Sequence, residues 1–399
     1  MFIEEKISTK IEGRYDVAVC GGGVAGISAA LAAARMGKKV VLFERQFMLG
    51  GLATAGLITI YLPLCDGFGR QVSFGIAEEL LRLSVSEGYE DRYPENWLDG
   101  IGTRTEKDKR FEIRYNAQLF AILAEKLLLS EGVEILYGTY AVGVDMKDGK
   151  IKHIITENKS GRLAFEVFSV VDATGDCDIA HFSGVPTVGF NQGNILASWY
   201  YSVGSDGYKL NMLGASDIPD ELKTDKNKVK LLMDRRFSGL EGKEISEFTQ
   251  LSHNSIYNHF SKKRQVDESY LPVTIPTVPQ LRMTRRIVGE YSLATEEMHK
   301  RFEDSIGMVS DWRRRGPVYE VPLRTLYSKS VKNLIVAGRC TSVTEGLWDV
   351  MRVIPCCAVT GQAAGVAAAM SDDFVSSLSV AQLQKALVEN KVVLHESEL

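Results

Sequence analysis

The chain has 399 residues, a formal net charge of −4 at pH 7 and 25% charged residues. A chain of this length can bury a large core and corresponds to about two domains, and its charge balance lacks the basic footprint of a nucleic-acid-binding protein. Its six cysteines have no repeating spacing, which argues against a disulfide framework and against a zinc module.

Residues 1–14 form a polar segment, MFIEEKISTKIEGR, without the apolar core of a signal peptide. No uninterrupted apolar run in the sequence reaches the length of a membrane span. We therefore expect a protein of a reducing compartment, located in the cytoplasm, with no membrane span and no nucleic-acid partner. Residues 1–14 themselves read as a short lead-in that could pair at a sheet edge.

The strongest pattern begins with a strand, a glycine-rich turn and a helix. Tyr15–Cys20 is a Val-rich apolar run, which is typical of a buried parallel strand. The Ala- and Leu-rich run Ile27–Met36 predicts a helix, and Gly37 is expected to end it in a left-handed conformation. Between strand and helix the sequence GGGVAG fits G-x-G-x-x-G, with Gly21, Gly23, Val24, Ala25 and Gly26 as its members.

A second apolar strand, Lys39–Phe43, ends at Glu44. In such a unit Gly21 permits a sharp turn, Gly23 admits a pyrophosphate close to the backbone, and Gly26 lets the helix pack on the strand. The helix N-terminus offers unpaired N–H groups to phosphates, and the Glu44 carboxylate can accept hydrogen bonds from a ribose diol. The order of strand, glycines, helix, strand and acid predicts a dinucleotide site, against the alternative of a glycine-rich turn that binds nothing.

Small residues return in the segment LGGLATAGL, residues 49–57, where Gly50 and Gly51 would let the backbone lie against a flat ligand. A second glycine cluster so soon after the acid suits a long cofactor. The segments that follow are a polar turn at Cys65–Arg70, an amphipathic helix at Ile76–Ser84, a polar, loop-rich stretch at 86–110, a strand at Phe111–Tyr115, a helix at Ala117–Leu129 capped by Asn116, and a strand at Val133–Tyr137.

From Ala141 to Val171 the sequence predicts antiparallel strands separated by turns. This meander ends in Val170–Asp176, an apolar strand that delivers small residues and a carboxylate to one edge, as a second ligand-facing loop would. The segment from Gly184 to about Leu326 lacks the α/β rhythm, and we interpret it as a separate cap or substrate domain.

The last part of the chain returns to the first pattern. Leu334–Ala337 predicts a buried strand that ends at Gly338 and Arg339. A loop is expected next, containing Glu345–Trp348 and Arg352–Pro355. The small-residue helix Gly361–Ala369 then suits close contact with a neighbour or a ligand.

Residues 15–51, Val170–Asp176 and Leu334–Ala369 together resemble the FAD-dependent oxidoreductases with a glutathione-reductase-type FAD fold. More closely, the chain is similar to the FAD-dependent oxidoreductase family that is distantly related to fumarate reductase flavoproteins. The resemblance covers most of the chain, including Arg285–Glu290 and Tyr319–Arg324. It implies an α/β fold: a Rossmann-like FAD-binding domain with a parallel sheet, helices and an antiparallel β-meander, built from residues 1–183 and 327–399, and an inserted α+β substrate or cap domain over 184–326.

The resemblance also implies roles for individual residues. The glycine turn would hold the pyrophosphate, Glu44 the adenosine ribose, and the backbone near Ala141 the adenine. A helix that opens near Pro355 would point its N-terminus at the N1/O2 edge of the flavin. The full set expected to bind FAD is Gly21, Gly23, Val24, Ala25, Gly26, Glu44, Arg45, Gly50, Gly51, Ala53, Thr54, Ala141, Ala173, Thr174, Gly175, Asp176, Gly338, Arg339, Arg352 and Pro355.

The sequence lacks three motifs found in related flavoenzymes, and their absence limits the chemistry that we expect. The sequence has no second G-x-G-x-x-G unit for NAD(P)H and no C-x-x-C near the flavin segments, so disulfide exchange is not expected. No histidine lies near the paired glycines, where some fumarate reductase relatives attach FAD covalently. We therefore expect non-covalent FAD and no metal.

Arginines of the segment 282–286 and of the C-terminal part are candidates for binding an anionic substrate. Arg286 and Arg324 are the best candidates for catalysis, because a guanidinium group can orient a carboxylate over the flavin. The alternative is that these arginines, with Arg282, Arg285 and Arg352, are solvated charges or members of salt bridges.

Other side chains allow two interpretations each. Cys356–Cys357 could be redox-active beside the flavin or could be small buried fillers, and Cys65 has the same status. Trp199–Tyr201 could line a substrate pocket or pack in a core. His253 and His259 lie on an expected helix and read as surface residues rather than acid–base groups.

The resemblance implies an enzyme that transfers a hydride between FAD and a small organic substrate in a cleft between the FAD and cap domains. An anion is the candidate substrate. The alternative is a non-catalytic protein that kept the fold as a binding or escort module. The sequence does not specify the substrate, the direction of the reaction, the electron donor or acceptor, or the oligomeric state.

Overall fold

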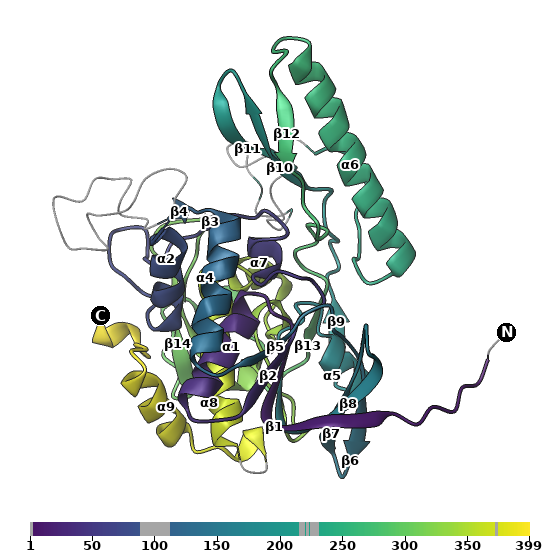
Figure 1. Cartoon of the computed structure of the whole chain (residues 1–399). Helices are drawn as coiled ribbons and strands as arrows, with labels where there is room; N and C mark the ends of the chain where they lie inside the picture. Colours follow the sequence, from purple (N-terminus) through teal and green to yellow (C-terminus); the bar gives the residue numbers. More distant parts are fainter. Residues whose placement is uncertain (1–2, 88–111, 215–219, 221–222, 224–230, 372–373) are drawn as a thin grey trace.

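The computed structural model describes residues 3–87, 112–214, 220, 223, 231–371 and 374–399. Its centre is a seven-stranded sheet in the order β5-β2-β1-β8-β7-β6, with β16 paired to β8 (Figure 1). These strands are β1 Lys10–Cys20, β2 Val40–Phe43, β5 Glu134–Leu136, β6 Tyr140–Lys147, β7 Lys150–Asn158, β8 Gly161–Asp172 and β16 Leu334–Val336.

The sheet combines a parallel half with an antiparallel meander. Strands β5, β2, β1, β8 and β16 pair in parallel, whereas β8, β7 and β6 pair antiparallel. The fold class expected from the sequence is therefore confirmed. Because the carboxyl ends of parallel strands meet at one edge, the loops after β1, β2, β8 and β16 lie together there.

Strand β1 begins earlier than the sequence indicated. Its first residues, Lys10–Arg14, pair with β8, while β2 pairs only from Val17 onward. This part of the expected lead-in thus lies at a sheet edge. The polar stretch expected at 86–110 falls almost wholly outside the described residues.

Helices α1, Val24–Arg35, and α8, Ile354–Met370, pack against each other beside the sheet. An added Cβ at Gly361 would lie 2.3 Å from the Ala25 carbonyl oxygen, and one at Gly365 would lie 2.2 Å from that of Ala29. Helix α8 therefore carries small residues because the backbone of α1 lies directly against it. The remaining helices are α2 Ile76–Val85, α4 Ala117–Ser130, α5 Asp178–Phe182, α6 Gly242–Arg264, α7 Glu345–Met351 and α9 Val380–Glu389.

Local sequence signals predicted the ends of several helices correctly. Asn116 caps α4 by accepting a hydrogen bond from the Leu119 N–H at 3.0 Å, and Gly37 follows α1 with φ at +77°. The loop expected around Glu345–Trp348 was wrong, because this segment is α7. Gly346 and the short length hide the helix in the sequence, whereas burial of Leu347–Met351 stabilises it in the fold.

An arm rises from the body (Figure 1). It consists of α6 and the three-stranded sheet β11-β10-β12. Trp199–Tyr201 are at most 5% exposed, so they pack in a core. His253 is exposed as expected, but His259 is half-buried and lies 2.7 Å from the Tyr200 hydroxyl.

Among the described residues, three two-stranded sheets accompany the central sheet and the arm: β3–β4, β9–β13 and β14–β15. Within 184–326, β14 and β15 pack against α8 and its neighbours rather than in the arm. The division into 1–183 with 327–399 and 184–326 stays a prediction. The bounds are β3 Ile60–Tyr61, β4 Ile113–Arg114, β9 Thr187–Gly189, β10 Ser198–Gly204, β11 Gly207–Leu213, β12 Leu271–Thr274, β13 Arg285–Ile287, β14 Ser305–Ser310 and β15 Val318–Pro322.

Short 3₁₀ turns occur at Gly51–Ala53, Thr295–Glu297, Leu323–Thr325, Gly338–Cys340, Val375–Ser377 and Glu396–Glu398. Among the described residues, no single helix has both the length and the apolar composition to cross a membrane. Helices α7 and α8 have this length and composition only when they are taken together, and this pair is bent by 88°.

Candidate functional site

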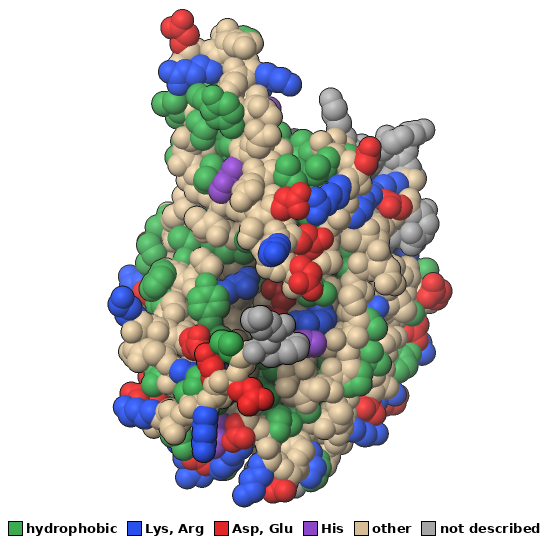
Figure 2. Space-filling view, turned by 90° about the vertical axis from the view of Figure 1, so that its right-hand side faces the viewer, with side chains coloured by type: hydrophobic (Ala, Val, Ile, Leu, Met, Phe, Trp, Pro, Cys, Tyr) green, Lys and Arg blue, Asp and Glu red, His purple; other side chains and the backbone are tan. Residues whose placement is uncertain are grey.

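A cavity of about 1090 Å³, including its open mouth, lies at the carboxyl edge of the parallel strands. The face drawn in Figure 2 is hollowed below the arm, with acidic and basic side chains around the hollow. The lining residues are Cys20, Gly21, Gly23, Val24, Ala25, Phe43, Glu44, Arg45, Gln46, Gly50, Gly51, Leu52, Ala53, Thr139, Tyr140, Ala141, Ala173, Thr174, Gly175, Asp178, Val278, Ala337, Gly338, Arg339, Arg352, Ile354 and Cys357.

Most residues expected to bind the cofactor therefore share one cavity, although they come from segments that are far apart in the sequence. Four of them are not in the lining: Gly26, Thr54, Asp176 and Pro355. The sequence analysis missed Asp178, two positions after the expected acid, and Val278, which no local pattern marks. Val278 is the one lining residue from 184–326 among the described residues.

The turn between β1 and α1 has the geometry that its glycines predicted. Gly21 has φ at +102°, and a Cβ there would lie 2.4 Å from the Ala173 carbonyl oxygen. A Cβ at Gly26 would lie 1.8 Å from the Gly21 carbonyl oxygen, so Gly26 shapes the turn from behind. A Cβ at Gly23 would meet no atom within 4 Å. The backbone at Gly23 therefore borders open space, and no side chain caps the N-terminus of α1.

Glu44 is held rigidly at the cavity wall and is only 5% exposed. Its Oε2 accepts a hydrogen bond from the Gly22 N–H and its Oε1 accepts one from the Gln46 N–H, both at 2.7 Å. Burial raises the pKa of this carboxyl, while the two N–H donors oppose that shift. Each oxygen keeps a lone pair that can accept a further hydrogen bond.

The paired glycines form the wall next to the glycine turn. Gly50 pairs with Gly23 in an isolated bridge, and a Cβ at Gly51 would lie 3.3 Å from the Gly23 Cα. Thr54 is buried behind this loop and donates its hydroxyl to the Leu49 carbonyl oxygen. Its described contacts are therefore with the loop itself.

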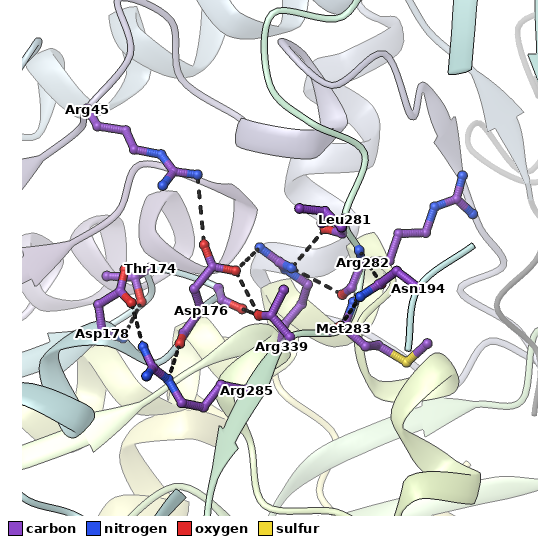
Figure 3. Close-up of polar contacts among 12 residues, drawn as sticks. Arg45, Thr174, Asp176, Asp178, Asn194, Leu281, Arg282, Met283, Arg285 and Arg339 are labelled. Atoms are coloured by element: carbon purple, nitrogen blue, oxygen red, sulfur yellow. Dashed lines mark hydrogen bonds and ion pairs between the residues drawn. The ribbon is translucent and has the colours of Figure 1, made fainter. Parts of the chain in front are cut away.

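Asp176 lies between two arginines that line the cavity (Figure 3). Its carboxylate is 3.8 Å from an Arg45 Nη2 and 3.5 Å from the Arg339 Nη2, and it accepts a hydrogen bond from the Thr284 hydroxyl at 2.8 Å. Arg339 Nη1 also donates to the carbonyl oxygens of Leu281 and Arg282, each at 3.1 Å. The loops after β2, β8 and β16 are thereby tied to the segment that returns from the arm.

Asp178 lines the cavity and accepts a hydrogen bond from Arg285 at 2.8 Å. Burial, together with the neighbouring carboxylates of Asp176 and Asp172, raises its pKa to about 6, and Arg285 opposes that rise. Asp178 can therefore change its charge near neutral pH.

Three buried groups lie behind this loop: the ligand atoms of Asp172, Cys177 and Cys340 are within 4.8 Å of one another. The Asp172 carboxylate already accepts hydrogen bonds from the Thr174 N–H and hydroxyl and from the Ala180 N–H. Burial raises the pKa of the Cys177 thiol well above its ordinary value. The Asp172 carboxylate therefore serves to hold the loop that follows β8, and Cys177 and Cys340 are free thiols.

The far end of the cavity is formed by the bend between α7 and α8. Pro355 stands in the first turn of α8, as expected, and Arg352, Ile354 and Cys357 line the cavity. Burial raises the pKa of Cys357 to about 12, although Arg339 and Arg352 lower it. The thiol donates to the Arg352 carbonyl oxygen at 3.2 Å, so near neutral pH it is not a thiolate nucleophile.

The arginines named for catalysis have different surroundings. Arg324 makes a two-pronged ion pair with Asp304, at 2.9 and 3.1 Å, and its side chain is 43% exposed. The Arg286 side chain is half-buried with no hydrogen bond or ion pair among the described residues, and its Nε is fully buried. Desolvation lowers its pKa, which Glu345 partly offsets. Neither arginine lines the cavity described above.

The walls of the cavity fit an elongated dinucleotide such as FAD. Open backbone at Gly23 and the uncapped end of α1 can receive phosphates. The buried acceptor Glu44 and Ile354, at the uncapped start of α8, belong to the same wall. No side chain of the described residues fills the space beside Gly23.

Comparison with known proteins gave a family match over most of the chain. A family model described as FAD dependent oxidoreductase matches residues 16–195 and 197–387. The thioredoxin reductase of Ureaplasma parvum serovar 3 is 36% identical over 76 residues, which are 19% of this chain and 25% of that protein.

Solved structures with similar folds are distant in sequence. A geranylgeranyl bacteriochlorophyll reductase-like protein of Thermoplasma acidophilum is 14% identical, with a TM-score of 0.47, over 95% of this chain and 84% of that chain. The p-nitrophenol 4-monooxygenase of Pseudomonas putida is 12% identical, with a TM-score of 0.44, over 95% and 84%. A flavocytochrome c3 fumarate reductase is 14% identical, with a TM-score of 0.42, over 90% and 78%.

Proposed function

Because the chain belongs to the FAD-dependent oxidoreductase family, we propose that it transfers a hydride between non-covalently bound FAD and a small organic anion. FAD is the cofactor of this family, and when bound it supplies the group that takes up or gives the two electrons. The remaining steps are assigned to this chain's own residues.

The first step is to hold the dinucleotide across the two halves of the cavity. The N–H groups at the start of α1 bind the pyrophosphate, and Glu44 accepts hydrogen bonds from the adenosine ribose. Arg45 and Arg339 both line the cavity. The Asp176 carboxylate holds them in place, and their remaining N–H groups can donate to a phosphate from the cavity side. This assignment is supported by the cavity, because Glu44, Arg45, Arg339 and the glycines Gly21 and Gly23 all line it.

The second step is to favour negative charge at the far end of the cavity. The N-terminus of α8 has no side-chain cap, so its N–H groups and dipole attract an anion. Arg352 adds a guanidinium group with no acidic partner among the described residues, and its Nε is buried without a hydrogen bond. Together they would favour negative charge on a flavin held there.

The third step is to orient the substrate, and we assign it to Arg286. The observation that carries this assignment is its half-buried guanidinium group without a carboxylate in contact among the described residues. An uncompensated buried charge costs on the order of a few kcal/mol, which a substrate carboxylate would offset by a forked pair of hydrogen bonds. Arg324 is not used here, because Asp304 already occupies its fork.

The test begins with the purified protein. We expect yellow protein that releases about one FAD per chain on denaturation, since no covalent link is proposed. Under anaerobic conditions the flavin absorbance should change with one or more members of a panel of hydroxy acids, unsaturated acids and sugars, and anionic members should act at lower concentration. Bound FAD with no response to the panel or to an external reductant would favour the alternative of a binding or escort module.

A further inference from the structure

The indole of Trp348 connects the cofactor cavity with Arg286. We propose that Trp348 is a positioning residue, which fixes the loop of Arg339 through its N–H group and supports the guanidinium group of Arg286 through its ring. The part that concerns Arg286 rests on the function proposed above, whereas the part that concerns Arg339 rests on the cavity alone.

The contact with the cofactor loop is a buried hydrogen bond. Trp348 is 0% exposed, and its Nε1 donates to the Arg339 carbonyl oxygen at 2.8 Å. The loop has little other freedom to vary, because Gly338 has φ at +66° and its N–H donates to the Thr360 hydroxyl at 2.9 Å. The two hydrogen bonds fix consecutive residues that both line the cavity.

The contact with Arg286 is a cation–π interaction. The guanidinium carbon lies 5.0 Å from the centre of the Trp348 ring, within the range in which such a pair attracts. Phe190 meets the same ring edge to face, at 5.7 Å and 85°, so the ring cannot rotate freely. With no hydrogen bond to the Arg286 side chain among the described residues, the ring is its main support.

Helix α7, which carries Trp348, is held in place by side chains from a neighbouring segment. Arg313 Nη1 donates to the Gly346 carbonyl oxygen and to Asp349 Oδ1, each at 2.9 Å. The Nε1 of Trp312 donates to the Asp349 carbonyl oxygen at 2.8 Å. Trp312 thus also donates an indole N–H to a backbone carbonyl oxygen, but its bond goes to α7 and not to the loop of Arg339. Trp312→Phe is therefore the control for loss of an indole donor elsewhere.

The first experiment measures FAD binding to FAD-free protein by fluorescence titration. Trp348→Phe keeps an aromatic ring and deletes the N–H donor, so the dissociation constant should rise about three- to tenfold, the usual effect of one buried hydrogen bond. Trp312→Phe should leave it unchanged. Trp348→His, which retains a ring N–H, should fall between wild type and Trp348→Phe. Equal affinities for wild type and Trp348→Phe, or equal losses in Trp348→Phe and Trp312→Phe, would overturn the role at the loop.

The second experiment uses acetate as an anion probe and reads the flavin absorbance spectrum of FAD-saturated protein. Trp348→Phe should bind acetate nearly as well as wild type, because it keeps a ring under Arg286, whereas Trp348→Leu should bind it at least threefold more weakly. Identical acetate affinities in wild type and Trp348→Leu would overturn the supporting role.

A wild-type spectrum that does not respond to acetate would instead contradict the anion site of the proposed function. In that case the FAD titration alone decides the role of Trp348. The two failures are therefore distinguishable. Thermal unfolding of each FAD-free variant identifies any that is not folded. If Trp348→Phe is not folded, Trp348→Leu, which also lacks the N–H donor, replaces it in the FAD titration, and Trp348→His, which keeps a ring, replaces it in the acetate comparison.

Discussion

Two carboxylates at the cavity wall, Glu44 and Asp178, are held in different ways. Glu44 accepts hydrogen bonds from two backbone N–H groups, whereas Asp178 accepts one from the Arg285 side chain. Burial raises the pKa of both. Glu44 is therefore a fixed acceptor and Asp178 a group whose charge depends on pH.

Glu44→Ala should weaken FAD binding about tenfold to a hundredfold, since hydrogen bonds to a charged group contribute about 1.5–3 kcal/mol. The variant should also unfold more easily, because the Gly22 N–H loses its buried acceptor. Glu44→Gln keeps one acceptor oxygen and should lose less of both. Titration of FAD-free protein with FAD measures the effect, and an unchanged dissociation constant in Glu44→Ala would contradict the ribose role.

Asp178 should make stability depend on pH. Its pKa in the folded protein, about 6, is above the ordinary value of 3.8. The folded state therefore binds the proton more tightly than the unfolded chain, and stability is lost as the pH rises from about 4 to above 6. Full desolvation would make this about 3 kcal/mol, but the side chain is 32% exposed, so about 1–2 kcal/mol is expected.

The check is urea unfolding of FAD-free wild type and Asp178→Asn at pH 4.5 and pH 7.5. The amide cannot ionise, so the variant should gain stability relative to wild type at the higher pH. The measured quantity is the difference in unfolding free energy between variant and wild type, compared at the two pH values. Loss of the Arg285 contact changes the stability of the variant at both pH values, so only the change in this difference reports the ionisation of Asp178. A constant difference would mean that Asp178 does not titrate in this range.

At the scale of the elements, the contact between α1 and α8 sets the distance between the two halves of the cofactor site. Gly365→Ala places a Cβ 2.2 Å from the Ala29 carbonyl oxygen, and such overpacking typically costs about 1–3 kcal/mol. Gly242→Ala in α6, where a Cβ meets nothing within 4 Å, is the control and should be neutral or slightly stabilising. Equal melting temperatures for the two variants would contradict the close packing.

Helices with their own start and stop signals could be predicted from the sequence. Asn116 before α4 and the glycine turn before α1 are such signals. Helix α7 could not, because what stabilises it is tertiary: Arg313 bonds to Gly346 and Asp349 from a segment more than 30 residues away. Local patterns do not contain that information.

At the scale of the whole molecule, the glycine turn after β1 and the loop after β16 meet although they are far apart in sequence. A Cβ at Gly338 would lie 2.9 Å from the Ala25 Cβ, and both residues line the cavity. The motifs predicted this meeting because parallel strands bring their carboxyl ends to one edge.

The environment of the arginines could not be predicted in the same way. Arg286 and Arg324 look equally suitable in the sequence. Only the fold shows that Asp304 pairs with Arg324 and that Trp348 lies beneath Arg286. Pairing of charges depends on neighbours distant in sequence, and so does the placement of Val278 in the cavity wall.

The most direct test of the account compares two matched substitutions, Arg286→Lys and Arg324→Lys, once the anaerobic panel has identified a substrate. Lysine keeps the charge and loses the fork. With FAD content equal in all three proteins, stopped-flow measurement of the flavin absorbance should show slower flavin reduction or weaker substrate binding in Arg286→Lys, and wild-type behaviour in Arg324→Lys. Wild-type rates and affinity in Arg286→Lys would contradict the proposed function of this arginine.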